Sequence, residues 1–463
     1  MPGEINREMG TEYLLGDEEI AGFVARGYHI LDPDIDARIH RDVRQQTRAA
    51  CENGANPGNA IYEMVPALKQ VLSHPQVVGA LSSILGPDYY MECHRHVHCT
   101  SPGQQAGSFH QDGTPRALRG WTRPWRYGHR PRKVLLVYFP QAVGKELGPT
   151  SVVPGSQYYR RQPEDMQRLE RRVEGGEGIM AIVHFSCWHR AGANQTGEER
   201  IMLKFLFDRQ GEPASPGWDA RPGYEPDFAA KARTWSRREG GDLLTLPKTW
   251  QTMWNWLAGR GAARLGGAES LTALMAKSGS ERESEALEAA YSIGGQLDSV
   301  GAHRLVERIC AGSESEREMA ALALSASGRV AGPALRQALA AADPWLRAMA
   351  VDIAGDLGRE SIGLLPEIER ALDDEDAWVR HNAAQALEIW GQEANAAEQS
   401  VVRALDDPEA FVRFNALGAL MNMRPLDARC TELLHRVATR DAAQPQWRAQ
   451  DALRRLRNDK LSY

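Results

Sequence analysis

A histidine and an aspartate lie two residues apart in the segment FHQDGTP, residues 109–115. A Pro-Gly turn in SPGQQAG, residues 101–107, comes just before them. Side chains alternate between the two faces of a β-strand, so His110 and Asp112 point to the same side if the segment is extended. Two side chains of the kind that binds metal ions would then converge on one point.

A third ligand is expected from the segment VHFSCWHRAGANQTGEERIMLKF, residues 183–205. His184 and His189 lie there five residues apart, so on a continuous strand at most one of them faces the metal. His189 precedes a turn of small residues, where a ligand at a barrel mouth would lie, whereas His184 is expected to pack in the core. Two histidines and one carboxylate leave three positions of an octahedral ion open, which suits non-haem Fe(II). A His-x-Asp pair also occurs by chance, so this spacing alone is a weak signal.

The composition limits the classes of protein. With 463 residues, the chain has room for two or more domains. Its formal net charge of -6 argues against a nucleic-acid partner bound through bulk charge. The sequence contains no apolar run near the roughly twenty residues of a membrane span, and its acidic beginning does not have the pattern of a signal peptide. Six cysteines without a CxxC motif are typical of reduced thiols, and we expect a cytoplasmic protein.

The first half of the chain has the pattern of a β-rich domain. Up to about residue 210, short runs of β-branched and aromatic residues alternate with Gly and Pro turns, as in RKVLLVYFPQAV (132–143) and GIMAIVHFSCWH (178–189). Such runs favour an antiparallel sandwich or barrel. A stretch rich in Pro and Gly, residues 209–227, then interrupts the pattern.

The second half repeats itself with a period of 33 residues. The triplets WLR (345–347), WVR (378–380) and FVR (411–413) each follow an acidic or proline-containing turn. Apolar residues in register after each triplet mark one face of a helix. The pattern predicts an α-solenoid that resembles HEAT-type repeats over roughly residues 280–457. Such arrays either bind proteins or support a neighbouring domain, and the repeat favours neither role.

Three motifs occur in a fixed order: HQD at 110–112, LGPTSVVPGSQYY at 147–159 and WHRAGANQTGEERIMLKFLF at 188–207. With the opening LGDEEIAGFVARGYHILD, they resemble the phytanoyl-CoA dioxygenase family of Fe(II) and 2-oxoglutarate-dependent oxygenases over about residues 15–210. The resemblance implies a double-stranded β-helix, a jelly-roll or cupin-like barrel with the metal at one open end.

These observations predict an α+β multidomain chain. We expect an oxygenase domain at residues 1–245, connecting helices at 246–279 and an all-α HEAT-like solenoid at 280–463. Within the connection, LPKTWQTMWNWLAGRG (246–261) has tryptophans at helical spacing and is expected to fasten the solenoid to the barrel.

The resemblance also implies roles for single residues. It makes His110, Asp112 and His189 the iron ligands and Arg200 the residue that binds the distal carboxylate of 2-oxoglutarate. A guanidinium suits that role because it offers a planar fork of donors and stays charged. Related halogenases replace the carboxylate ligand with a small residue, so the presence of Asp112 favours hydroxylation over halogenation. In such a reaction O2 and 2-oxoglutarate are consumed, and succinate and CO2 are released. Desaturation, epimerisation and ring closure start in the same way and stay open.

A strand and a loop are candidates for the substrate pocket. The strand MECHRHVHCT, residues 91–100, places His94, His96 and His98 on one face. By resemblance, His96 or His98 contacts 2-oxoglutarate or substrate, and the alternative is a solvated stripe of histidines.

The loop is TPRALRGWTRPWRYGHRPRK, with six arginines, one lysine and no acid. Arg116 and Arg126 are candidates to bind an anionic substrate, and Trp121 and Trp125 to cover its apolar part. Alternatively, the loop docks on the acidic turns of the solenoid, LDDED and LDDPE.

Three functions are compatible with the sequence. We favour an oxygenase that acts on a small molecule and carries the repeats as an appendage. The alternatives are a protein or peptide hydroxylase whose solenoid recruits a protein partner, and a non-catalytic scaffold with an inactive barrel. The four intact site residues weigh against the scaffold. A chain truncated after about residue 262, if soluble, should keep activity on a small molecule but lose it on a protein substrate.

Overall fold

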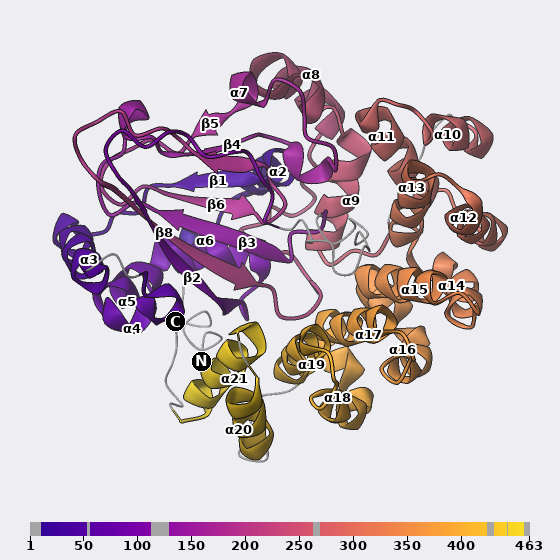
Figure 1. Ribbon diagram of the computed structural model, residues 1–463. Helices are drawn as coiled ribbons and strands as arrows, with labels where there is room; N and C mark the ends of the chain where they lie inside the picture. The colour runs from indigo at the N-terminus through magenta and orange to yellow at the C-terminus, as the bar shows by residue number, and fades with distance from the viewer. Residues whose placement is uncertain are drawn as a thin grey trace.

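Five antiparallel strands form the main sheet in the computed structural model, which describes residues 11–52, 56–112, 129–262, 269–423, 430–441 and 443–457 (Figure 1). The β-branched and aromatic runs form its central strands, because such side chains pack well on a pleated surface. The spatial order is β1 (Tyr28–Leu31), β6 (Met180–His184), β3 (Lys133–Tyr138), β8 (Arg200–Asp208) and β2 (Tyr90–Thr100).

A second antiparallel sheet faces the first across an apolar core. It has the order β5 (Arg171–Arg172), β4 (Thr150–Val152) and β7 (His189–Ala191). Buried side chains from β3, β6 and β8 meet Val152, Val173 and Cys187 from the small sheet and its flanking residues. Two antiparallel sheets over a shared core agree with the expected sandwich or barrel, whereas closure into a barrel stays a prediction.

Helices cover the other face of the main sheet. Apolar side chains such as Leu136 and Phe205 point away from the small sheet and pack in one core with the helices that precede β2. In Figure 1, α6 lies behind β3 and β8. These helices are α2 (Asp17–Arg26), α3 (Ala37–Ala50), α4 (Ile61–Met64), α5 (Ala67–Leu72) and α6 (Pro75–Leu85), and a further short helix, α7 (Met166–Leu169), precedes β5.

The second half folds into helix pairs, as the period of 33 residues predicted. The arginine of each triplet reaches the acidic turn of the following repeat: Arg347 pairs with Asp374, Arg380 with Asp407 and Arg413 with Asp441. The repeat therefore encodes a ladder of ion pairs as well as an apolar face. The helices are α10 (Leu271–Lys277), α11 (Glu283–Gly294), α12 (Ser299–Ala311), α13 (Glu314–Ser325), α14 (Gly332–Leu339), α15 (Pro344–Leu357), α16 (Leu365–Ala371), α17 (Ala377–Trp390), α18 (Glu398–Ala404), α19 (Ala410–Met423), α20 (Thr431–Arg440) and α21 (Ala443–Arg457).

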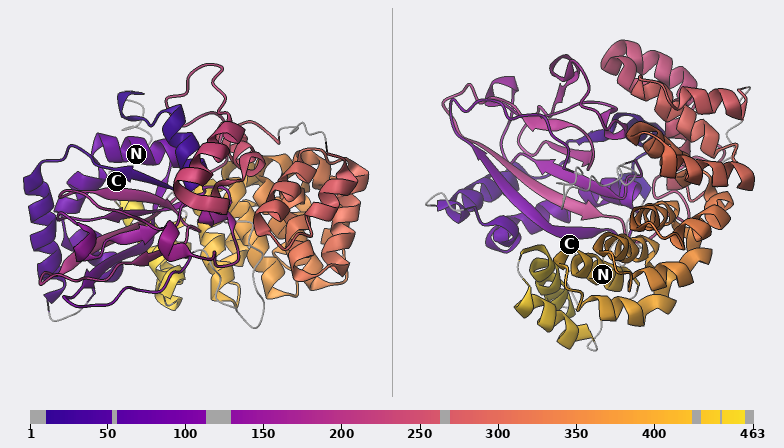
Figure 2. Two further views of the ribbon diagram at one scale, coloured as in Figure 1. Left: turned by 90° about the horizontal axis from the view of Figure 1, so that it is seen from above. Right: turned by 45° about the vertical axis from the view of Figure 1, so that its right-hand side comes forward.

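The solenoid curves around the sheets, with its odd-numbered helices on the inner side (Figures 1 and 2). Residues just before β3 dock on three of these helices. His129 Nδ1 lies 2.6 Å from the hydroxyl of Tyr291 on α11, Arg130 donates to the carbonyl of Ser325 on α13, and Arg132 donates to Asp356 on α15. The described end of the arginine-rich loop thus contacts the solenoid, but not at the LDDED and LDDPE turns.

The last helix of the solenoid closes on β2. Arg95, on the outer face of β2, pairs with Asp451 of α21 at 3.2 Å, and both side chains are almost fully buried. Arg448 of α21 bonds to Glu92 of β2 and to Glu388 of α17. The inner side of the solenoid is therefore used, along much of its length, to hold the sheets of its own chain.

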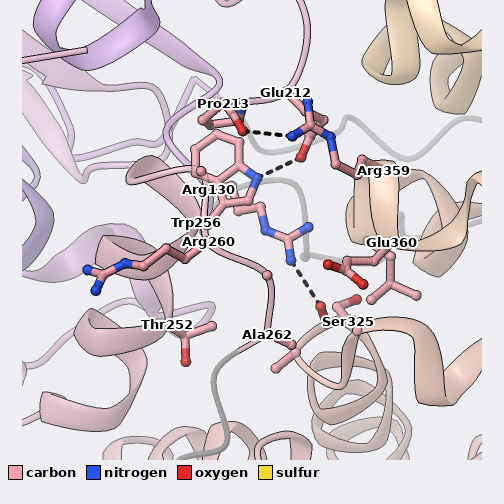
Figure 3. Close-up of a pocket in the computed structure, with 15 residues that line it drawn as sticks. Arg130, Glu212, Pro213, Thr252, Trp256, Arg260, Ala262, Ser325, Arg359 and Glu360 are labelled. Atoms are coloured by element: carbon pink, nitrogen blue, oxygen red, sulfur yellow. Dashed lines mark hydrogen bonds between the residues drawn. The ribbon is translucent and has the colours of Figure 1, made fainter. Parts of the chain in front are cut away.

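Helix α9 (Pro247–Leu257) lies between the sheet region and the first repeats, where a fastening helix was expected. Trp250 and Trp254 are buried and pack on Phe228 of α8 (Phe228–Trp235). Beside α9, a cavity of about 80 Å³ is lined by residues of α9 and of the repeats (Figure 3). There the Trp256 indole donates to Glu212. Hydrogen-bonded polar side chains thus line the cavity.

No helix within the described ranges is both long enough and apolar enough to cross a membrane.

Candidate metal and cosubstrate site

His110, Asp112 and His189 converge. One ligand atom from each of them lies within 4.8 Å of the others. Asp112 Oδ1 is 3.8 Å from His110 Nε2, and Asp112 Oδ2 is 3.8 Å from His189 Nε2. The premise that His110 and Asp112 share a strand was wrong: His110 forms a single bridge to His189, and Asp112 lies in the turn after it. The turn carries the carboxylate back toward both imidazoles.

The two imidazoles are held in a matching way by backbone carbonyls. His110 Nδ1 lies 3.1 Å from the carbonyl oxygen of Ser108, and His189 Nδ1 lies 2.9 Å from that of Cys187. A carbonyl can only accept, so each Nδ1 carries a proton, and Nε2 is the ring atom left to bind a metal at the centre. Metal-binding histidines are commonly oriented by such a second contact. The donor set therefore fits a divalent transition metal.

Burial and charge set the ionisation of the site. His189 is buried, which lowers its pKa and favours the neutral imidazole that binds metals. Burial acts to raise the pKa of Asp112, but the charge and the hydrogen bond of Lys204, together with the adjacent His189 ring, outweigh it and hold that pKa below its usual value. The carboxylate is thus ionised and able to bind a cation.

Arg200 is a buried cation at the start of β8. Its guanidinium donates to the carbonyl of Gly148 and to the hydroxyl of Thr100, while its Nε has no hydrogen-bond partner among the described residues. No carboxylate of the described chain forms an ion pair with it, and burial lowers its pKa to about 10. A buried guanidinium without an anionic partner is costly. The geometry fits a residue that receives a carboxylate from a ligand.

Two of the histidines on β2 lie near this centre. His96 is opposite Lys204 and His98 opposite Met202 in the β2–β8 register. Their rings are 4.6 Å apart, and His96 Nε2 contacts the Asn56 amide at 3.0 Å. Burial lowers the pKa of His98 to about 3, and its Nε2 lacks a hydrogen-bond partner within the described ranges. His96 and His98 are therefore half-buried, whereas His94, on the same face, is exposed.

Sequence reasoning missed Lys204. Its ammonium lies 3.1 Å from Asp112 Oδ2, although the residue is hidden in the apolar run RIMLKFLFD of β8. The signal available was period two from Arg200, which puts residue 204 on the same face of the strand. His184 is buried on β6, as expected for a core histidine.

The remaining substrate candidates, Arg116, Trp121, Trp125 and Arg126, lie outside the described residues.

Two regions of the chain match models of known families. Residues 10–202 match the family model of phytanoyl-CoA dioxygenase, and residues 332–398 match that of HEAT repeats. The dioxygenase andF of Emericella variicolor is 28% identical over 140 residues, which are 28% of this chain and 46% of that protein. An uncharacterized protein of Mycobacterium tuberculosis is 25% identical over 152 residues, 32% of this chain and 49% of that protein. The chain thus spans about half the length of these curated relatives.

Two solved structures share some likeness with this chain. The non-heme alpha ketoglutarate dependent carbocyclase SnoK from nogalamycin biosynthesis is 17% identical, with 48% of this chain and 92% of that chain covered and a TM-score of 0.35. EctD from S. alaskensis, solved with 2-oxoglutarate and 5-hydroxyectoine, is 14% identical, with 45% and 82% covered and a TM-score of 0.35. On the two family models, residues 10–202 form a domain of the phytanoyl-CoA dioxygenase family and residues 332–398 are HEAT repeats.

Proposed function

We propose that this chain is a non-haem Fe(II) and 2-oxoglutarate-dependent dioxygenase that hydroxylates an unactivated C–H bond of a small, anionic molecule, with release of succinate and CO2. The observation that carries the proposal is the convergence of His110, Asp112 and His189. The same domain contains the buried Arg200, which has no acidic partner among the described residues. The family of residues 10–202 supports the same class of enzyme.

Each residue has a defined task in this proposal. His110 and His189 would hold Fe(II) through Nε2 and Asp112 through one carboxylate oxygen, because the Ser108 and Cys187 carbonyls fix the rings in that orientation. When bound, the metal and 2-oxoglutarate supply the oxidising chemistry with O2.

The surrounding side chains complete the site. Arg200 would orient 2-oxoglutarate by its distal carboxylate. His96 and His98, neutral and on the same face of the sheet as Lys204, would line the space for cosubstrate or substrate. Half-buried neutral rings limit the water near the reacting atoms without adding charge.

The domain plan belongs to the same proposal. Residues 1–245 would form the jelly-roll oxygenase domain, 246–279 the connection and 280–463 the solenoid. Because ion pairs such as Arg95–Asp451 seat the inner side of the solenoid on the sheets, the contacts support an appendage that buttresses the oxygenase. A protein partner, which HEAT repeats are known to bind, would have to use the outer helices.

The test is an anaerobic titration of the purified chain with Fe(II) and 2-oxoglutarate, followed by the weak visible metal-to-ligand charge-transfer band. We expect the band in the wild type, a weaker band in Arg200→Leu and Asp112→Ala, and a wild-type band in the surface control His435→Gln. Iron bound to the wild type without any band on addition of 2-oxoglutarate would refute the proposal and leave the scaffold function.

A further inference from the structure

Lys204 is a cation of the proposed active site. Its acidic partner, Asp112, would become a metal ligand when the site is filled. Lys204 lies in the middle of β8, is 9% exposed, and points to the same side of the strand as Arg200 and Met202. Its Nζ is 3.1 Å from Asp112 Oδ2. Within the described ranges, Asp112 is the one carboxylate that pairs with it.

The other polar groups beside Lys204 carry no compensating negative charge. His96 is directly opposite on β2, and His94 and His98 flank it on the same face. Burial lowers the pKa of all three, so they are neutral near pH 7. Asp112 is the acid that acts on His94 and His98 as well as on Lys204.

Filling the proposed site leaves a positive charge without a partner. The two charges of the metal balance the two carboxylates of 2-oxoglutarate, and Asp112, as a ligand, offsets only one of the two side-chain cations, Arg200 and Lys204. Burying an unpaired charge is unfavourable, so the filled site favours a ligand with a negative group. The ammonium has three donors, and Asp112 uses one of them.

Resting on the proposed function, we propose that Lys204 recognises an anionic oxygen group of the substrate, a carboxylate or a phosphate, and so sets the substrate class of the enzyme. The solvent side of the site is at His110, whose side chain is 54% exposed, whereas that of Lys204 is 11% exposed. The anion would lie deeper than His110, beside the carboxylate ligand and on the side of the chamber lined by the β2 histidines.

The experiment uses the full-length chain loaded anaerobically with Fe(II) and 2-oxoglutarate. Sodium acetate and methyl phosphate are titrated separately at constant ionic strength, and the change in the charge-transfer band gives an apparent Kd for each. The variants are Lys204→Met, Lys204→Gln and Lys204→Arg, with Lys277→Met on α10 as the matched surface control. Circular dichroism and thermal unfolding show which variants are folded.

We expect a saturable response in the wild type and in Lys277→Met, an apparent Kd weaker by roughly 10–100-fold in Lys204→Met and Lys204→Gln, and near wild-type binding in Lys204→Arg. The anion that binds more tightly assigns the group as a carboxylate or a phosphate.

The inference is overturned if the wild type shows the charge-transfer band but neither anion changes it. The same holds if the Lys204→Met and Lys204→Gln variants bind the anions as tightly as the wild type does. It is also overturned if folded Lys204→Met has lost the band, because Lys204 would then act only by holding Asp112. A wild type that shows no band at all refutes the proposed function itself.

Discussion

His110 and His189, 79 positions apart in the chain, exchange both of their backbone hydrogen bonds, each N–H donating to the other's carbonyl at 3.0 Å. In an antiparallel pair of this type the two side chains leave the backbone on the same side. Their ring centroids are 4.4 Å apart as a result. The backbone bridge, rather than a continuous strand, places the two proposed ligands together.

Replacing either histidine should therefore remove metal binding without unfolding the chain. We expect His110→Gln and His189→Gln to bind Co(II) at least 10–100-fold more weakly than the wild type, since loss even of a supporting contact has an effect of that size. Equilibrium titration followed by the Co(II) absorption spectrum measures it. The exposed His435 gives a control, His435→Gln, and equal affinities in all four proteins would exclude this metal site.

Arg200→Leu separates cosubstrate binding from folding. The metal-free variant should be as stable as the wild type or more so, because a buried cation without an acidic partner is replaced by an apolar side chain. Its Kd for 2-oxoglutarate should rise by roughly 10–100-fold, the value of one charge-assisted contact. Thermal unfolding with and without 2-oxoglutarate and Mn(II) measures both effects. A cosubstrate shift in Tm as large as in the wild type or in the exposed control Arg329→Leu would contradict the assignment.

His184 should make the fold sensitive to acid. Burial, with the nearby His129, lowers its pKa to about 3, whereas the unfolded chain binds a proton near 6.5. The unfolded state thus binds more protons than the folded state between these pH values. The contribution of the neutral His184 to stability is therefore full above about pH 6.5 and falls as the pH drops toward 3. From pH 7.5 to 5 the wild type should lose about 2 kcal/mol more than His184→Gln. Urea unfolding at both pH values measures this difference, and equal losses would show that His184 does not titrate in this way.

The sequence indicated which candidate ligands converge better than it indicated the residues around them. HQD and the later His189 were found because their types and order are local features. Lys204 was missed because an isolated lysine in an apolar strand gives no sign of which carboxylate it will meet, and that carboxylate is 92 residues away.

The contact between solenoid and sheets was also beyond local reasoning. The period of 33 residues predicted helix pairs because each repeat carries its own apolar face and its own arginine. That period does not say what the inner side touches. Arg132–Asp356 and Arg95–Asp451 join residues more than two hundred positions apart, and nothing in either segment marks the other.

Truncation after about residue 262 should therefore be more harmful than the sequence suggested. It would leave Glu92, Arg95, Arg130 and Arg132 on the sheet side without their solenoid partners. Removal of the repeats also exposes apolar side chains of α9 that share a core with them, such as Trp256 and Leu257, and this favours a poorly soluble fragment. The soluble fraction after expression, followed by thermal unfolding, measures this. A soluble fragment that unfolds cooperatively at the wild-type Tm would show that the interface adds little stability.

Arg448 gives the sharpest test of how firmly α21 is held on β2. It is 2% exposed and bonds to Glu92, Glu388 and the Phe414 carbonyl. Because Arg448→Met leaves the buried Glu92 and the partly buried Glu388 with fewer cations, we expect the free energy of unfolding to fall by about 3–5 kcal/mol.

Arg454, on the same helix, pairs with Glu63 in a partly exposed position, so Arg454→Met should lower it by no more than about 1 kcal/mol. Chemical unfolding of both variants decides the matter. An equally small decrease in the free energy of unfolding for both variants would mean that solvent or neighbouring groups compensate the charges around Arg448. Arg448 would then contribute little to holding α21 on β2.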